Sequence, residues 1–146
     1  MKSVPVWVVN LKRSVERRRF MGTLLTRLGL AFEIVEAIDG TNLSPEQRGR
    51  YSRWRAFARL GRELHPGEIG CALSHASIYE RMLENRVSEC LVVEDDITIE
   101  PDLVRILECR ERLPVDWEVV NFTNHIAGDI PLDVSPRVGT YRACRF

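Results

Sequence analysis

An apolar run that ends abruptly in three consecutive carboxylates constrains the fold of this chain more than any other feature. The run is Leu-Val-Val at residues 91–93, and Glu94, Asp95 and Asp96 follow it directly. Such a run is typical of a strand buried in a parallel sheet. Adjacent acids repel one another and are tolerated where water, cations or hydrogen-bond donors compensate them. We therefore expect a strand end at a ligand-binding sheet edge, with a divalent metal as the simplest compensation.

Strand-like and helix-like segments alternate before this run, which is the pattern of a sheet with crossover helices. Residues 4–9 predict the first strand and residues 32–36 the second, which leads into an Asp39-Gly40 turn. Between them a helix is predicted to begin after Ser14 as its cap and to end at Gly29 in a left-handed turn. Its apolar stripe, spaced i, i+3, i+4 and i+7, consists of Met21, Leu24, Leu25 and Leu28. These segments predict a βαβ unit.

One further helix is predicted from Ser44 to about Leu60, because a cap, a proline at the first helical position and a capping-box glutamine follow in order. The segment interleaves five arginines with three aromatic residues. Such a pattern is either a nucleic-acid patch or a solvated arginine face over packed aromatic side chains. Because 21 basic and 21 acidic residues cancel, we favour the arginine face and expect no nucleic-acid partner.

The segment that begins at Pro66 predicts another helix. Its expected buried stripe is Ile69, Ala72, Leu73, Ala76 and Leu83. Gly67 and Gly70 near its start would let a ligand approach the backbone, where free amides attract an anion such as phosphate. His75 lies one turn after Cys71 and is a metal ligand, a ligand contact or a hydrogen-bonded structural histidine, the interpretation that the residues alone favour. The four cysteines form no C-x-x-C pair, which argues against a zinc site or a redox motif.

Beyond the acidic strand end, the sequence predicts a helix from Pro101 and strands at 117–122 and 138–141. A chain of 146 residues that is 45% hydrophobic suffices for one domain. No apolar stretch approaches the roughly 20 residues of a membrane span, and none at the N-terminus is long enough for a signal peptide. We therefore expect a cytoplasmic protein, with peripheral association at the inner membrane face left open.

Four sequence blocks follow one another over about the first hundred residues. They are Val8-Val9-Asn10-Leu11-Lys12-Arg13-Ser14 with Arg17-Arg18, then Ala37-Ile38-Asp39-Gly40, then the ten residues from Pro66 to His75, and Val93-Glu94-Asp95-Asp96. In this order they resemble the blocks of glycosyltransferase family 25, which includes bacterial lipooligosaccharide galactosyltransferases and animal collagen galactosyltransferases. The bacterial branch is the closer likeness.

The resemblance implies an α/β fold with a GT-A-like, Rossmann-related sheet and flanking helices. It implies a nucleotide-sugar donor, UDP-galactose or another UDP-hexose, and transfer with inversion to a lipooligosaccharide or lipopolysaccharide acceptor. A Mn²⁺ or Mg²⁺ ion is expected on Glu94 and Asp96, which point to one side if strand geometry persists, and it would neutralise charge on the departing UDP. The implied donor-binding residues are Asn10, Leu11, Arg13, Arg17, Asp39, Gly67, Glu68, Gly70, Ser74, His75 and Asp95.

Several of these roles have a plain structural alternative. Arg13 and Arg17 would pair with phosphate or with Asp39, whereas residues 17–19 are equally a basic surface cluster on an amphipathic helix. Asp39 itself is either a ribose or uracil contact or a turn aspartate. The sequence leaves these alternatives open.

Members of the family run further than this chain. The resemblance therefore implies that residues 1–146 form a single family 25 domain, truncated at the C-terminus and lacking most of the acceptor half. An inverting transfer needs a carboxylate that accepts the proton of the acceptor hydroxyl. Asp129 and Asp133, the only acids after Glu118, match no motif, so the general base stays unassigned.

Three functions follow from this sequence. The first is a metal-assisted glycosyltransferase that elongates a cell-envelope oligosaccharide. The second is a truncated, non-catalytic fragment that keeps a nucleotide-sugar site and self-associates through uncovered apolar surface, although the sequence fixes no oligomeric state. The third, a metal-dependent phosphohydrolase, is disfavoured because no nucleophile or second metal cluster accompanies the acids.

Overall fold

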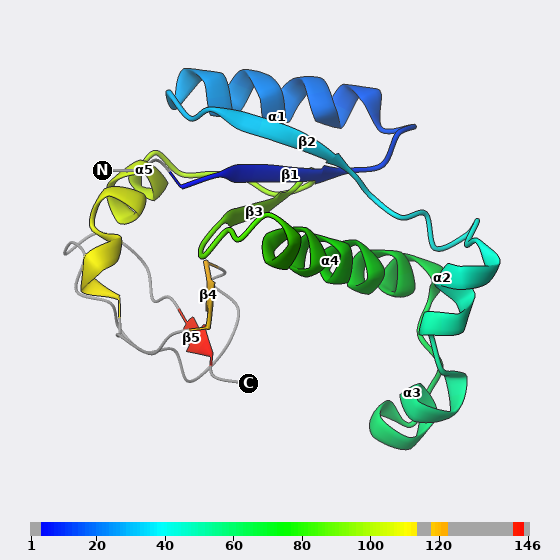
Figure 1. Cartoon of the computed structure of the whole chain (residues 1–146). Helices are drawn as coiled ribbons and strands as arrows, with labels where there is room; N and C mark the ends of the chain where they lie inside the picture. The colour runs from blue at the N-terminus through cyan, green and yellow to red at the C-terminus, as the bar shows by residue number, and fades with distance from the viewer. Residues whose placement is uncertain (1–3, 114–117, 123–141, 145–146) are drawn as a thin grey trace. The chain divides into compact units, whose positions relative to one another are not determined.

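The computed structural model describes residues 4–113, 118–122 and 142–144. The chain divides into two compact units, Met1–Ile97 and Thr98–Phe146, and each is described by itself. In the first unit the elements are β1 (Val6–Asn10), α1 (Val15–Arg27), β2 (Phe32–Glu36), α2 (Pro45–Arg50), α3 (Arg53–Leu60), α4 (Pro66–Glu84) and β3 (Leu91–Glu94) (Figure 1). In the second they are α5 (Asp102–Glu108), the 3₁₀ turn η1 (Arg110–Arg112), β4 (Val119–Asn121) and β5 (Arg142–Cys144).

A parallel three-stranded sheet in the order β2-β1-β3 forms the centre of the first unit. All five residues of the middle strand β1 are buried, as expected for a strand covered on both faces. Asn10 lies opposite Glu36, and Val9 lies opposite Glu94, so the carboxyl ends of the three strands meet at one edge. The predicted βαβ unit and the buried strand before the acids are confirmed.

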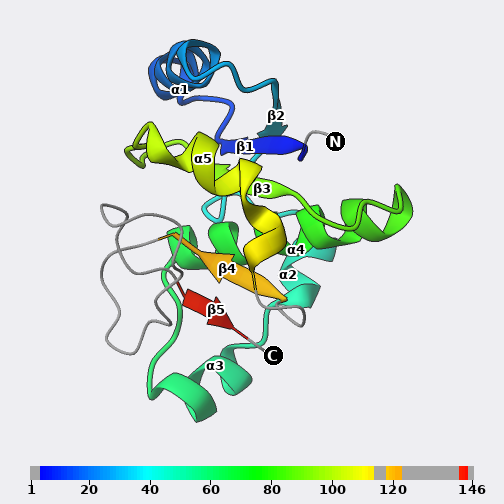
Figure 2. The same cartoon turned by 90° about the vertical axis from the view of Figure 1, so that its left-hand side faces the viewer.

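Two helices cover the two faces of this sheet. Figures 1 and 2 show α1 on one face and α4 on the other. Trp7 and Val9 of β1 pack with Ile78 of α4 in one buried cluster. The intervening strand residues point to the opposite face, where Met21 and Leu25 of α1 are fully buried. The predicted stripe of α1 is therefore confirmed at its centre.

Helix α1 ends as the sequence predicts. Gly29 has a φ of 71°, and its N–H donates to the Thr26 carbonyl at 3.0 Å while the Leu30 N–H donates to the Leu25 carbonyl at 3.0 Å. This pair of bonds is the Schellman motif, in which a left-handed glycine satisfies the last helical carbonyls. The helix also begins at Val15, directly after Ser14 as predicted, but the side chain of Ser14 makes no capping hydrogen bond.

The single helix expected over residues 44–60 is wrong. The chain forms α2 and α3 instead, because Tyr51 is extended (φ −98°, ψ 129°) and the Ser52 side chain accepts a hydrogen bond from the Arg55 N–H at 3.3 Å, capping a new helix. The aromatic packing expected there is wrong as well. Trp54 is 80% exposed and Phe57 57% exposed, since the short α3 turns this face to solvent.

The stripe predicted for α4 is only partly confirmed. Ile69 and Leu73 are buried, but Ala72 is exposed and Leu83 is 80% exposed. The remaining buried positions of this helix are Gly70, Ser74 and Ile78. Small and polar side chains occupy the buried face near the start of α4 because a loop of backbone, rather than apolar side chains, packs there.

That loop is the stretch from Ile38 to Gly40, which follows β2 and crosses α4 in direct backbone contact. A Cβ atom on Gly70 would lie 2.5 Å from the Ile38 carbonyl oxygen and 2.8 Å from the Gly40 nitrogen. A Cβ atom on Gly40 would overlap the Pro66 carbonyl. The hydroxyl of Ser74 accepts from the Ile38 N–H at 2.8 Å. Only glycine fits at both sides of this crossing.

Most of the described residues of the second unit lie in its four short elements. The helix expected from Pro101 is confirmed as α5, and the strand expected at 117–122 as β4, which pairs with β5 antiparallel. The strand expected at 138–141 and the acids Asp129 and Asp133 lie outside the described residues. Within the described ranges, no helix combines the length and apolarity needed to cross a membrane.

The crossing predicts different outcomes for two glycines of the same helix. Gly70→Ala should lower the free energy of unfolding by about 2–4 kcal/mol, because the added methyl meets backbone that cannot rotate away. Gly67→Ala meets no atom within 4 Å and should be neutral or stabilising by up to about 1 kcal/mol, because alanine favours the helix. Urea unfolding of both variants measures the difference, and equal stabilities would contradict the crossing.

Candidate functional site

Asn10 fastens the end of β1 to the acidic turn that follows β3. Its side chain is 2% exposed, and its Nδ2 donates to the Ser14 carbonyl at 3.0 Å and to Asp95 Oδ2 at 2.6 Å. The other atom of the amide, Oδ1, is buried with no hydrogen-bond partner among the described residues. A buried polar atom without a partner is costly, so a donor that reached this oxygen would stabilise the site.

The three acids have different surroundings. Arg17 Nη1 lies 3.3 Å from Asp95 Oδ1 and 3.7 Å from Asp96 Oδ2. The Asp95 side chain is largely buried, whereas that of Asp96 is 56% exposed. Asp95 is thus held by a guanidinium and an amide, and Asp96 presents its carboxylate to solvent.

Glu94 belongs to another group of side chains. Its Oε1 lies 3.1 Å from His75 Nε2 and 3.6 Å from Cys71 Sγ. Strand β3 ends at Glu94 and the next two residues form a turn, so the strand geometry on which Glu94 and Asp96 were expected to share one side does not persist. The two predicted metal ligands contact different partners.

Burial and the Glu94 carboxylate together raise the pKa of the Cys71 thiol above its ordinary value.

Two hard-oxygen carboxylates, Asp96 and Glu94, remain partly exposed at this edge. A divalent cation that prefers oxygen fits Asp96 best, because Asp95 is already held by Arg17 and Asn10.

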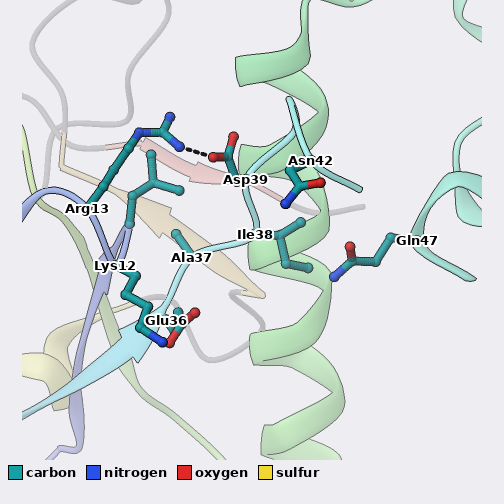
Figure 3. Close-up of a pocket in the computed structure, with 9 residues that line it drawn as sticks. Lys12, Arg13, Glu36, Ala37, Ile38, Asp39, Asn42 and Gln47 are labelled. Carbon is teal, nitrogen blue, oxygen red and sulfur yellow. Dashed lines mark hydrogen bonds and ion pairs between the residues drawn. The ribbon is translucent and has the colours of Figure 1, made fainter. Parts of the chain in front are cut away.

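A pocket of about 470 Å³ opens beside the ends of β1 and β2 (Figure 3). Its lining residues are Leu11, Lys12, Arg13, Glu36, Ala37, Ile38, Asp39, Asn42 and Gln47. Arg13 and Asp39 form an ion pair across it. The pocket therefore combines two cations with several hydrogen-bonding side chains, and its size falls within the range of small-ligand sites.

Asp39 acts both as a turn residue and as a pocket residue. Its Oδ1 accepts from the Thr41 N–H at 3.0 Å and from the Thr41 hydroxyl at 2.7 Å, which is the local bonding of an Asx turn. Its Oδ2 pairs with Arg13. The turn interpretation and the Arg13–Asp39 pairing considered from the sequence both describe this residue.

The structure adds pocket residues that sequence reasoning missed, namely Lys12, Glu36, Asn42 and Gln47. The signal for Glu36 was present, because it ends β2 opposite Asn10 and strand ends of a parallel sheet share one edge. Lys12 lay inside the first sequence block. Gln47 was assigned only its capping role, which it does perform by accepting from the Ser44 N–H at 2.9 Å.

The predicted residues at the start of α4 are not among those that line this pocket. Gly70 and Ser74 hold the loop from Ile38 to Gly40 that forms one wall of it. Glu68 accepts from the His65 N–H at 2.7 Å and pairs with Arg62 at 2.7 Å. These hydrogen bonds lower the pKa of Glu68 to about 2. Contact between these predicted residues of α4 and a nucleotide-sugar donor stays a prediction.

Comparison with known protein families shows the family of this chain. The sequence profile described as "Glycosyltransferase family 25 (LPS biosynthesis protein)" matches residues 3–125. The chain belongs to glycosyltransferase family 25. The resemblance inferred from the four sequence blocks is thereby confirmed at the level of the family, and the α/β fold with its small parallel sheet is compatible with a GT-A-like domain.

Several relatives of this chain are animal proteins. Procollagen galactosyltransferase 2 of Mus musculus is 32% identical over 126 residues, which cover 79% of this chain and 20% of that protein. A glycosyltransferase 25 family member of Drosophila melanogaster is 35% identical over 125 residues, 80% of this chain and 20% of its own length. The inactive glycosyltransferase 25 family member 3 of Homo sapiens is 30% identical over 131 residues, 79% and 21%. The family 25 chain thus spans about one fifth of the length of these relatives.

Asn10→Asp tests the link between the first strand and the acidic turn. The substitution keeps the shape of the side chain but sets a carboxylate against Asp95 in a buried position, so the free energy of unfolding should fall by about 3 kcal/mol at pH 7. The loss should shrink as the pH falls and the new carboxyl group is protonated. Asn42→Asp at an exposed position is the control and should change stability by less than about 0.5 kcal/mol.

Glu68 gives a second pH-dependent prediction. Because its folded pKa is about 2, below the ordinary value of 4.5, the Arg62 pair stabilises the fold above pH 4.5 and is lost as the pH falls toward 2. Glu68→Gln should lower the Tm by about 2 °C at pH 7, and this gap should close in acid. Thermal unfolding in a double-mutant cycle with Arg62→Gln checks it, since additive effects would show that the two side chains do not interact.

Proposed function

We propose that this chain is the donor-binding part of a glycosyltransferase that takes a hexose from a UDP-sugar, with galactose as the expected sugar. The observation that carries the proposal is the meeting of the pocket and the Asn10–Asp95–Arg17 cluster at the carboxyl edge of a parallel sheet. This edge is where α/β proteins bind nucleotides. The name of the mouse relative, a galactosyltransferase, supports galactose.

Cationic side chains supply the binding of the diphosphate. Lys12 and Arg13 line the pocket, and Arg17 lies on the first turns of α1 beside the acidic turn. Guanidinium groups donate paired, charge-assisted hydrogen bonds to phosphate oxygens. Arg13 already pairs with Asp39, so a bound diphosphate would compete with this carboxylate for the guanidinium.

Other polar side chains that line the pocket supply the binding of the nucleoside. Asn42 and Gln47 offer amide groups, and Glu36 and Asp39 offer carboxylates that accept hydrogen bonds from ribose hydroxyls. The side chains of Ile38 and Ala37 add apolar contact. This division of the pocket assigns Asp39 to the nucleoside end, as the family resemblance implies.

A hard divalent cation, Mn²⁺ or Mg²⁺, is proposed at Asp96, with Glu94 as the second carboxylate named by the resemblance. Such an ion would supply positive charge to the diphosphate as the sugar departs. Asp96 is suited to this because its carboxylate is exposed beside Arg17 rather than enclosed. The residues of the chain then hold the nucleotide, orient it and keep Asp95 in place.

The acceptor is proposed to be a lipooligosaccharide or lipopolysaccharide, with inversion at the transferred sugar. The support is the likeness of the sequence blocks to the bacterial branch and the description of the matching family profile. The animal relatives carry a different printed name, procollagen galactosyltransferase, so collagen-type acceptors are the competing possibility. A panel of both acceptors distinguishes them.

A second function has one specific observation in its favour. A human relative that is 30% identical over 131 residues is named an inactive family member, so a similar sequence occurs in a protein whose name describes it as inactive. This chain would then bind a nucleotide sugar without transferring it. Incubation with labelled UDP-galactose, with and without acceptor, separates the two, because the transferase releases UDP and the binding protein does not.

The first experiment is calorimetric titration of the chain with UDP in the presence of Mn²⁺. We expect binding that EDTA weakens. Arg13→Ala should weaken it about tenfold or more through loss of a charge-assisted hydrogen bond, and Asp96→Asn should remove the metal dependence.

Arg19→Ala is the matched control, because Arg19 lies on the same helix but pairs with Glu16. It should bind UDP like the unmodified chain. Absence of binding by a folded chain would overturn the proposal, and binding that is indifferent to Mn²⁺ and to Asp96 would overturn the metal assignment alone.

A further inference from the structure

We propose that Cys71, His75 and Glu94 form a binding site for a borderline-soft transition-metal ion such as Zn²⁺. Each of the three side chains contacts another within the cluster. Their ligand atoms all lie within 4.8 Å of one another. None of the three residues lines the pocket proposed for UDP, but Glu94 is also the second carboxylate of the hard-cation site proposed at Asp96. The proposal requires no nucleotide.

The backbone places the three ligands on regular elements. Cys71 and His75 are four residues apart on α4, so they lie on one helix face, one turn apart. Glu94 is the last residue of β3, the strand that pairs with β1. A site built on a helix and a strand holds its ligands more precisely than one built on loops.

Two of the three distances between the ligand atoms are close to those around a tetrahedral zinc ion. Zinc bonds of about 2.3 Å to sulfur and about 2.1 Å to oxygen or nitrogen imply separations of about 3.6 Å for sulfur to oxygen and about 3.4 Å for nitrogen to oxygen. The structure has 3.6 Å from Cys71 Sγ to Glu94 Oε1 and 3.1 Å from His75 Nε2 to the same oxygen. Small side-chain adjustments suffice to receive an ion.

The ligand types select the class of ion. A thiolate and an imidazole favour Zn²⁺ or Co²⁺, whereas Mg²⁺ and Mn²⁺ prefer oxygen donors. Binding converts the Cys71 thiol to a thiolate and releases one proton to solvent. Three protein ligands leave the fourth tetrahedral position to water or another small ligand, and the partial exposure of His75 and Glu94 gives that position access.

Titration of the intact chain with Co²⁺ under reducing conditions tests the site directly. We expect a one-to-one complex with a thiolate-to-cobalt charge-transfer band and the intense visible bands of tetrahedral cobalt. Zn²⁺ should abolish both bands, and excess Mg²⁺ should leave them unchanged. Cys71→Ser should remove the charge-transfer band, and His75→Gln should weaken Co²⁺ binding about tenfold or more.

Controls come from residues of the same types outside the cluster. Cys90→Ala removes a cysteine directly before β3 that contacts Met82 instead, and His65→Gln removes the histidine directly before α4. Both should bind Co²⁺ like the unmodified chain. Absence of a charge-transfer band in a chain that circular dichroism shows to be folded, or a band that survives Cys71→Ser, would overturn the proposal. Neither result would bear on UDP binding, which is measured separately.

Discussion

The buried amide of Asn10 is the interaction on which the geometry of the sheet edge depends. One nitrogen joins the Ser14 carbonyl, before α1, to Asp95, after β3. Strand β1 lies between the other two strands, so its end can reach segments that are far apart in sequence. Arg17 approaches the same carboxylate from α1. The position of the acidic turn is therefore set by two side chains from the opposite end of the unit's sequence.

This arrangement changes the interpretation of the three consecutive acids. Their mutual repulsion predicts a compensating charge, and the sequence suggested a metal. In the structure the carboxylates separate, because the strand ends at Glu94 and the turn directs Asp95 and Asp96 toward Arg17 while His75 approaches Glu94. Side chains of the protein itself therefore compensate the negative charge of the carboxylates first. A bound cation would then add to a charge pattern that already exists, which favours a reversible association with the nucleotide over a permanent structural ion.

Much of the fold could be predicted because its signals are local. The spacing of apolar residues, helix caps and turn glycines are properties of short segments. The observed bounds of β2 and the end of α1 at Gly29 agree with what these signals predict. The break between α2 and α3 at Ser52 also has a local signal, but that signal is ambiguous. A serine inside an arginine-rich run is compatible with one continuous helix, and only its capping hydrogen bond shows that a new helix begins there. The exposure of Leu83 was beyond sequence reasoning, since it depends on how far α4 extends past the sheet.

The residues of the candidate site, too, could be predicted only in part from the sequence. Arg13 and Asp39 were within reach of the sequence, because each belongs to a block that follows a predicted strand. The role of Gly70 could not be predicted from the sequence. A glycine at a helix start suggests the approach of an anion or a ligand, but the group that approaches Gly70 is the carbonyl of Ile38 in the same chain. A family block can therefore preserve a residue that shapes the pocket without touching its contents. Ser74, which bonds the same loop residue, fits this pattern, so two residues of the block from Pro66 to His75 hold a wall of the pocket without lining it.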